Sequence, residues 1–133
     1  MANSSPKLLV VDDLKDWQKT IGGVLQDRGY DVSVAGSVNE AVSLLSKTDY
    51  DLALLDLRLD ETDEENVEGL TLAEIIRDRW PQVKILIITG YGTPDTLQRS
   101  MEPDAQGKRL VEDFLPKGDT DKLIETVQRI LDK

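Results

Sequence analysis

The sequence predicts an α/β fold in which a parallel sheet of five strands carries helices on both faces. Short apolar runs alternate along the 133 residues with longer stretches whose apolar residues recur at helical spacing. Four-residue apolar runs at 8–11, 52–55 and 85–88 are typical of strands that are buried on both faces. Because strand and helix patterns alternate, we expect parallel strands joined by helical crossovers.

The first strand is followed by a helix and then by a second, less buried strand. The helix is indicated by apolar residues at helical spacing, namely Trp17, Ile21, Val24 and Leu25. Gly29 stands where this helix should end, because glycine is common just past a helix C-terminus. Val32 and Val34 alternate with polar neighbours, which predicts the second strand.

Two further helices flank the third strand. Ser37 and Glu40 have the spacing of a capping box and predict the start of a helix that runs through Ala41, Leu44 and Leu45. After the third strand, the next helix is indicated by apolar residues on one side, namely Leu72, Ile75, Ile76 and Trp80. Pro81 ends that helix, because helical geometry is disfavoured before a proline.

The last third of the chain predicts two strands and two helices. The strands are residues 85–88 and 111–115. Thr93, which is followed by proline, has the pattern of an N-cap and predicts a helix with Leu97 and Met101 on its inner face. The closing helix has the clearest amphipathic stripe, formed by Leu123, Ile124, Val127, Ile130 and Leu131.

These elements predict one domain over residues 1–133, with its core at about 7–131 and a flexible leader at 1–6. Right-handed crossovers favour a doubly wound, flavodoxin-like sheet with strand order 2-1-3-4-5 and five helices. The leader lacks the features of a signal peptide, and no apolar run approaches the ~20 residues of a membrane span. We therefore expect a cytoplasmic protein without membrane association.

The composition excludes several kinds of chemistry. The chain has no cysteine and no histidine, which excludes disulfides, thiolate or imidazole metal ligands, cysteine nucleophiles and Ser-His-Asp triads. The formal net charge of −10 argues against direct binding to nucleic acid or to anionic membranes. Any reaction has to depend on carboxylates, hydroxyls, lysine and backbone groups.

Polar residues end four of the five predicted strands, and they are Asp12, Asp13, Asp56, Thr89 and Lys117. The carboxyl ends of parallel strands lie at one edge of the sheet, where open α/β sheets bind ligands. We therefore expect these five side chains to meet. Taken singly, each also has an ordinary explanation, since an aspartate after a strand often caps the next helix.

Three carboxylates that share one crevice need a compensating charge. Two unit charges 4 Å apart repel by roughly 4 kcal/mol at an effective dielectric constant near 20, and Lys117 alone is too little for three carboxylates. Carboxylate oxygens without histidine or cysteine select Mg²⁺, Mn²⁺ or Ca²⁺, and Mg²⁺ typically combines a few carboxylates with phosphate and water. The pattern predicts a bound divalent cation, with Mg²⁺ expected and Mn²⁺ as the alternative.

Four segments resemble the signature of the receiver domain of two-component response regulators. They are VVDD at 10–13, LLD at 54–56, ITG at 88–90 and FLPK at 114–117. The resemblance implies that Asp56 accepts a phosphoryl group from the phosphohistidine of a sensor histidine kinase or a phosphotransfer protein. It also implies a Mg²⁺ ion whose ligands are Asp12, Asp13, Asp56 and the backbone carbonyl of Arg58.

The same resemblance implies roles for the residues around the phosphoryl group. Its oxygens are bound by Thr89, Gly90 and Lys117. Thr89 and Phe114 form a switch that alters a partner-binding face, whereas Arg58 and Tyr91 tune dephosphorylation, and we expect these two to slow the attack of water. We therefore expect a signalling domain that catalyses only its own phosphorylation and dephosphorylation and that acts on an output partner or an output domain.

The sequence departs from the family pattern at three places. The loop at 57–68 is longer than usual and rich in acidic residues, which indicates a solvated loop. Residues 102–109 form a longer and more polar connection, on the face that receivers use for dimerisation or partner docking. Gly118 follows Lys117 where the family usually has proline, so we expect the customary cis peptide to be absent.

Three other functions compete with the receiver interpretation. A Mg²⁺-dependent aspartyl phosphatase needs two aspartates separated by one residue, and the segment 56–58 breaks that spacing. A flavin carrier shares the topology, but two aspartates after the first strand would repel its phosphate. The remaining alternative is a pseudo-receiver that binds partners without being phosphorylated, and it is disfavoured by the set of Asp13, Asp56, Thr89 and Lys117.

Overall fold

A computed structural model describes residues 5–56, 68–89, 111–116 and 120–132 of the chain. In chain order, the elements are β1 (Lys7–Val11), α1 (Lys15–Asp27), β2 (Asp31–Ala35), α2 (Val38–Lys47), β3 (Leu52–Asp56), α3 (Glu68–Arg79), β4 (Lys84–Thr89), β5 (Asp113–Pro116) and α5 (Thr120–Leu131). The predicted helix that begins near Thr93 lies outside the described residues, as do residues 1–4 of the predicted leader. Within the described ranges, every helix is too short or too polar to cross a membrane.

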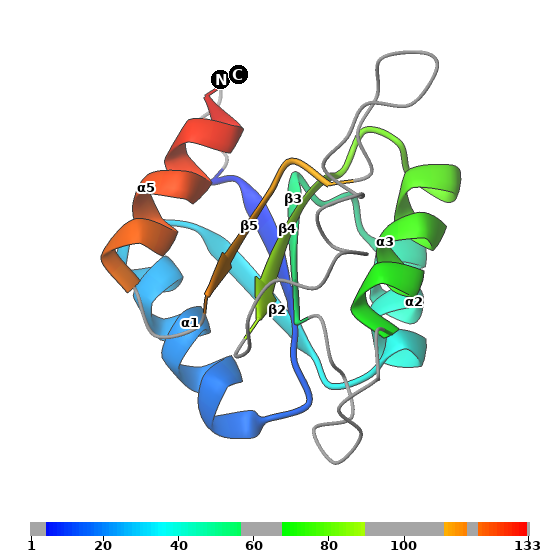
Figure 1. The fold of residues 1–133 in the computed structure, drawn as a ribbon, viewed down its shortest axis with the longest axis horizontal. Helices are drawn as coiled ribbons and strands as arrows, with labels where there is room; N and C mark the ends of the chain where they lie inside the picture. Colours follow the sequence, from blue (N-terminus) through cyan, green and yellow to red (C-terminus); the bar gives the residue numbers. More distant parts are fainter. Residues whose placement is uncertain (1–4, 57–67, 90–110, 117–119, 133) are drawn as a thin grey trace.

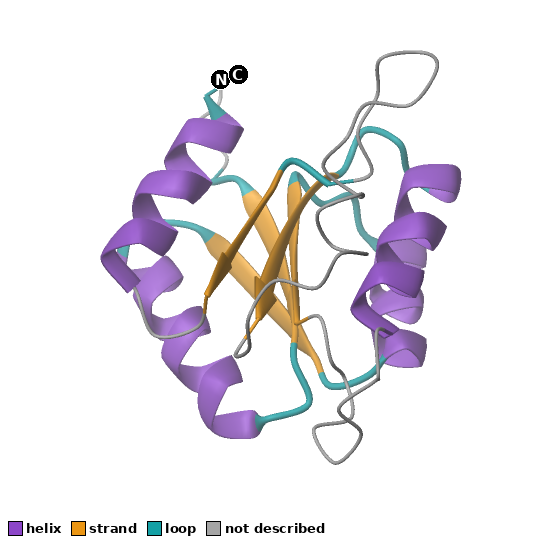
Figure 2. Ribbon diagram, viewed as in Figure 1, coloured by secondary structure: helices purple, strands orange, loops and turns teal. Residues whose placement is uncertain are grey.

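The five strands form one parallel sheet in the order β2-β1-β3-β4-β5. The helices α1 and α5 cover one face of this sheet, and α2 and α3 cover the other (Figures 1 and 2). The predicted flavodoxin-like fold and its strand order are therefore confirmed. Because all strands run in the same direction, their carboxyl ends lie along a single edge, at the bottom of the view in Figure 1.

Successive residues of each central strand point to opposite faces and fill two separate apolar cores. Leu9 and Ala53 belong to the core beneath α2 and α3. Their neighbours Leu8 and Leu52 belong to the core beneath α1 and α5. All four side chains are fully buried, so the unbroken apolar runs of the sequence reflect burial on both faces, as predicted.

Two helix ends follow the signals in the sequence. After the C-cap residue of α1, Gly29 adopts a φ of +91°, which lies in the left-handed region that favours glycine. At the start of α2, the side-chain oxygen of Ser37 accepts a hydrogen bond from the backbone N–H of Glu40 at 3.2 Å. The predictions of a C-terminal glycine and a serine N-cap are both confirmed.

The last strand begins later than predicted. We expected it at 111–115, but β5 spans Asp113–Pro116. Val111 is fully buried ahead of the strand, so its apolar character reflects core packing rather than strand pairing. The N–H of Glu112 donates to the carbonyl of Ile85 at 2.8 Å, which aligns the chain with β4 just before β5 begins.

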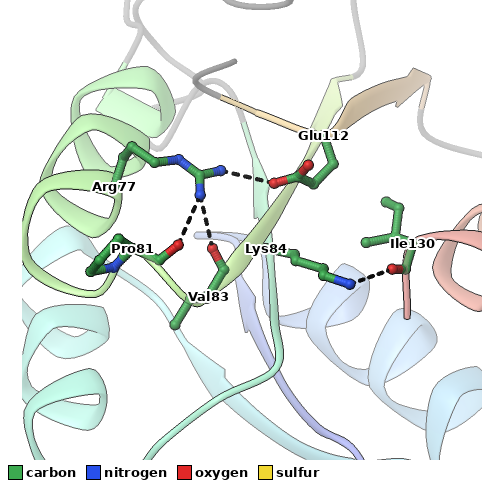
Figure 3. Close-up of polar contacts among 6 residues, drawn as sticks. All are labelled: Arg77, Pro81, Val83, Lys84, Glu112 and Ile130. Atoms are coloured by element: carbon green, nitrogen blue, oxygen red, sulfur yellow. Dashed lines mark hydrogen bonds and ion pairs between the residues drawn. The ribbon is translucent and has the colours of Figure 1, made fainter. Parts of the chain in front are cut away.

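Polar contacts hold together the edge of the sheet where the strands begin (Figure 3). The guanidinium of Arg77 in α3 donates to the carbonyl of Pro81 at 3.2 Å and to the carboxylate of Glu112 at 2.9 Å. The ammonium of Lys84 donates to the carbonyl of Ile130, near the end of α5, at 2.8 Å. These contacts fix α3 and α5 against the starts of β4 and β5.

Two glycines provide a matched test of the end of α1. Gly29→Ala should lower the free energy of unfolding by about 1–2 kcal/mol, because alanine is strained at positive φ. Gly23 lies inside the helix, and a Cβ added there meets no atom within 4 Å. Gly23→Ala should therefore raise the free energy by roughly 0.5–1 kcal/mol. Urea unfolding measures both changes, and two effects of the same sign would contradict this account.

Candidate metal centre

The first and third strands bring two aspartates to one edge of the sheet. Asp56 is the last residue of β3, and Asp12 follows β1 directly. The two strands pair in register with Val11 opposite Leu55. The residues that follow these two, Asp12 and Asp56, therefore also lie beside each other. Asp12 and Asp56 are both buried, with 2% and 3% of their surface exposed.

Asp13 completes a cluster of three carboxylates. One oxygen from each of Asp12, Asp13 and Asp56 lies within 4.8 Å of the other two. Asp13 is only half-buried. Of the five polar residues that the sequence places at the strand ends, the structure thus brings these three together.

Hydrogen bonds hold Asp12 in place. Its N–H donates to the carbonyl of Ala35 at 3.0 Å, and its Oδ1 accepts from the N–H of Leu14 at 2.9 Å. Asp12 therefore closes a turn just before α1 as well as belonging to the cluster. It does not cap the helix, because the N-cap residue of α1 is Leu14 and, within the described part of the chain, no side chain caps it. The Asp12 carbonyl accepts a hydrogen bond from the side-chain amide of Gln18 at 2.5 Å.

The cluster has a donor set and a spacing that suit a hard divalent cation. Two charges 4.8 Å apart repel by roughly 3.5 kcal/mol at an effective dielectric constant near 20. Octahedral Mg²⁺ places neighbouring oxygens about 3 Å apart and opposite oxygens about 4.2 Å apart, and the three oxygens all lie within 4.8 Å of one another. Asp13 has other contacts, but its Oδ1 is buried and accepts no hydrogen bond from the described residues. The three carboxylates therefore fit Mg²⁺ or Mn²⁺.

Two other predicted site residues fall within the described ranges. Thr89 is the last residue of β4, and its backbone pairs with that of Pro116 in β5. The residue before it, Ile88, pairs with Asp56 of β3. Phe114 lies in β5 and packs, half-buried, against the core beneath α2 and α3. The remaining predicted residues lie outside the described residues, and they are Arg58, Gly90, Tyr91 and Lys117.

Gln18 is a neighbour of the cluster that the sequence did not predict. Besides bonding the Asp12 carbonyl, its amide nitrogen would lie 3.5 Å from a Cβ added at Gly36, in the turn after β2. The only signal in the sequence is a polar residue between the helix-spaced Trp17 and Ile21. That signal does not distinguish a residue aimed at a loop from one that faces solvent.

Comparison with known proteins agrees with this geometry. Residues 8–128 match the family described as the response regulator receiver domain. The chain belongs to this family. Receiver domains are signalling domains of two-component systems, and the predicted resemblance is thereby confirmed.

Two curated relatives are bacterial regulators. The chain is 33% identical over 131 residues to the response regulator protein PilR of Pseudomonas aeruginosa, covering 96% of this chain and 27% of that protein. It is 29% identical over 126 residues to the nitrogen assimilation regulatory protein NtrX of Azorhizobium caulinodans, covering 94% of this chain and 26% of that protein. The chain spans about a quarter of the length of these relatives.

Solved structures share the fold. A response regulator from Thermotoga maritima has a TM-score of 0.79 to this chain at 25% identity, covering 97% of this chain and 99% of that one. The response regulator TrrA from the same organism, solved in complex with Mg²⁺ and BeF, has a TM-score of 0.76 at 26% identity. The match covers 95% of this chain and 99% of the TrrA chain.

Removal of one carboxylate should stabilise the metal-free protein. Asp13→Asn relieves two repulsions in the folded state that are weak in the unfolded chain, so the free energy of unfolding should rise by about 1–2 kcal/mol in EDTA. Saturating Mg²⁺ should stabilise the wild type more than the variant, because binding to the folded state adds stability. Urea unfolding with and without Mg²⁺ measures both effects.

Asp49→Asn is the matched control, because Asp49 is exposed in the turn before β3, at the opposite edge of the sheet. This variant should respond to Mg²⁺ as the wild type does. An Asp13→Asn protein that is less stable than the wild type in EDTA would contradict the repulsion argument.

Proposed function

We propose that this receiver domain accepts a phosphoryl group on Asp56 in a Mg²⁺-dependent reaction in the cytoplasm. The donor would be the phosphohistidine of a sensor histidine kinase or of a phosphotransfer protein. The observation that carries this proposal is the cluster of Asp12, Asp13 and Asp56, whose oxygens lie within 4.8 Å of one another. The domain would catalyse only its own phosphorylation and dephosphorylation.

The three aspartates, with the backbone carbonyl of Arg58, would hold the cation. When bound, Mg²⁺ offsets the negative charge of both the carboxylates and the incoming phosphoryl oxygens. The structure of TrrA with Mg²⁺ and BeF supports a cation in a relative of the same fold. Mn²⁺ suits the same set of oxygen donors.

Asp56 is suited to act as the nucleophile. One of its carboxylate oxygens forms a bond to phosphorus while the phosphorus–nitrogen bond of the donor breaks, and the electron pair leaves with the imidazole nitrogen. Such a reaction asks the protein mainly for positioning and for stabilisation of charge. The fold supplies the positioning, because Asp56 ends a strand that is paired on both sides. We assign Thr89, Gly90 and Lys117 to bind the transferred oxygens.

Phosphorylation would then change the surface around β5 and α5. The new oxygens on Asp56 would draw in the hydroxyl of Thr89, and Phe114 would turn toward the space thus vacated. The strands β3, β4 and β5 are neighbours in the sheet, so these three residues occupy successive strands. The altered face would bind a partner protein or an output domain, while Arg58 and Tyr91 would slow hydrolysis.

Asp56→Asn should abolish phosphorylation, because the amide lacks the nucleophilic carboxylate oxygen. With Mg²⁺ and acetyl phosphate, the mass of the intact wild-type protein should increase by one phosphoryl group. Hydroxylamine should displace this group as phosphate and leave the smaller added mass of an aspartyl hydroxamate. Asp56→Asn should gain no mass, and EDTA should prevent labelling of the wild type.

Asp49→Asn, which changes an exposed aspartate at the opposite edge of the sheet from the cluster, is the control and should be labelled normally. A wild-type protein that gains no mass with either acetyl phosphate or a phosphorylated kinase would favour the pseudo-receiver. Labelling that persists in Asp56→Asn would place the acceptor elsewhere.

A further inference from the structure

We propose that Gln18 is a positioning residue for the metal site, because its side-chain amide fixes the backbone carbonyl between the first two aspartates. The amide nitrogen of Gln18 lies 2.5 Å from the carbonyl oxygen of Asp12. This inference rests on the proposed cation site and adds to it a residue that is not a ligand.

The carbonyl that Gln18 holds belongs to the peptide bond between Asp12 and Asp13. A peptide unit is planar. A contact that fixes the oxygen of this unit therefore also fixes the direction in which the backbone continues to the Cα of Asp13. Other contacts fix the remaining groups of Asp12, because its N–H donates to Ala35 and its Oδ1 accepts from Leu14. Gln18 therefore supplies the contact to the carbonyl of Asp12, which is the group that joins Asp12 to Asp13.

Gln18 is itself held by the fold. Its backbone N–H donates to the carbonyl of Leu14 at 3.0 Å, in the first turn of α1. This helix is anchored in the core by Ile21 and Leu25, which are buried. On the other side, a Cβ added at Gly36 would lie 3.5 Å from the amide nitrogen of Gln18. The amide is thus confined between the loops that follow β1 and β2.

Orientation matters in a site of this kind. Mg²⁺ demands near-ideal octahedral geometry, so a change in the direction of one carboxylate weakens binding even when every ligand is present. Groups that orient metal ligands from outside the coordination sphere typically contribute 10–100-fold to metal affinity. Loss of the Gln18 donor should therefore weaken cation binding about tenfold, at the lower end of that range.

Gln18→Met tests this role, because methionine keeps the approximate shape of glutamine and removes the donor. Gln26→Met is the matched control. Gln26 lies eight residues further along α1, about 12 Å away along the axis, and lines the same groove between α1 and β2 as Gln18. A second variant, Gln18→Asn, keeps an amide that is one methylene too short to reach the carbonyl.

Binding of Mn²⁺ alone is measured by the electron paramagnetic resonance of the free ion, so phosphorylation is not needed. The Kd should rise about tenfold in Gln18→Met and in Gln18→Asn, and less than twofold in Gln26→Met. The amide nitrogen of Asp13, which shares a peptide unit with the bonded carbonyl, should change its ¹⁵N chemical shift in the two Gln18 variants only.

The outcomes separate this inference from the proposed function. If the wild type binds Mn²⁺ and both Gln18 variants bind it equally well, the positioning role is wrong and the cation site stands. If urea unfolding shows lower stability in these variants while the Kd is unchanged, Gln18 is merely structural and the inference is overturned. If the wild type does not bind Mn²⁺, the cation site fails and the positioning role fails with it.

Discussion

Three negative charges held at the ends of two adjacent strands are the constraint on which the rest of this structure depends. The strands β1 and β3 are buried on both faces and locked in register, so Asp12 and Asp56 cannot move apart without disrupting a close-packed core. The repulsion among these two carboxylates and Asp13 has to be offset by positive charge. Because the rigid apolar sheet holds these carboxylates close together, the binding of a cation at this edge is favoured.

The opposite edge of the sheet shows the contrasting arrangement. There, charges of opposite sign are paired, with Arg77 bonded to Glu112 and Arg129 bonded to Asp113 (Figure 3 shows the first pair). These pairs fasten helices to strands and favour the folded state. Stabilising contacts and like-charged carboxylates therefore occupy opposite edges of the same sheet, as expected where a functional site costs stability that other regions supply.

The sequence was sufficient to predict the fold and the carboxylate cluster, because both depend on periodicity and topology. Apolar runs such as 52–55 identify buried strands, and parallel strands necessarily present Asp12 and Asp56 at the same edge. The apolar pattern predicts the start of β5 too early, because Val111 is buried by core packing and periodicity alone does not separate that burial from strand pairing.

Contacts made by single side chains could not be predicted. The amide of Gln18 reaches the Asp12 carbonyl because of how the loop before α1 turns, and no repeating pattern in the sequence encodes that turn. Likewise, Arg77 and Glu112 are 35 residues apart, and their pairing depends on where the fold places the end of α3 relative to the residue just before β5. Such contacts arise only from the way the folded chain packs.

The most direct test of this account is a crystal structure of the protein grown with Mn²⁺, with anomalous diffraction used to locate the metal. We expect one anomalous peak in contact with the carboxylates of Asp13 and Asp56, within reach of Asp12 directly or through water. A map in which this cluster carries no metal while Mn²⁺ occupies other carboxylates would contradict it.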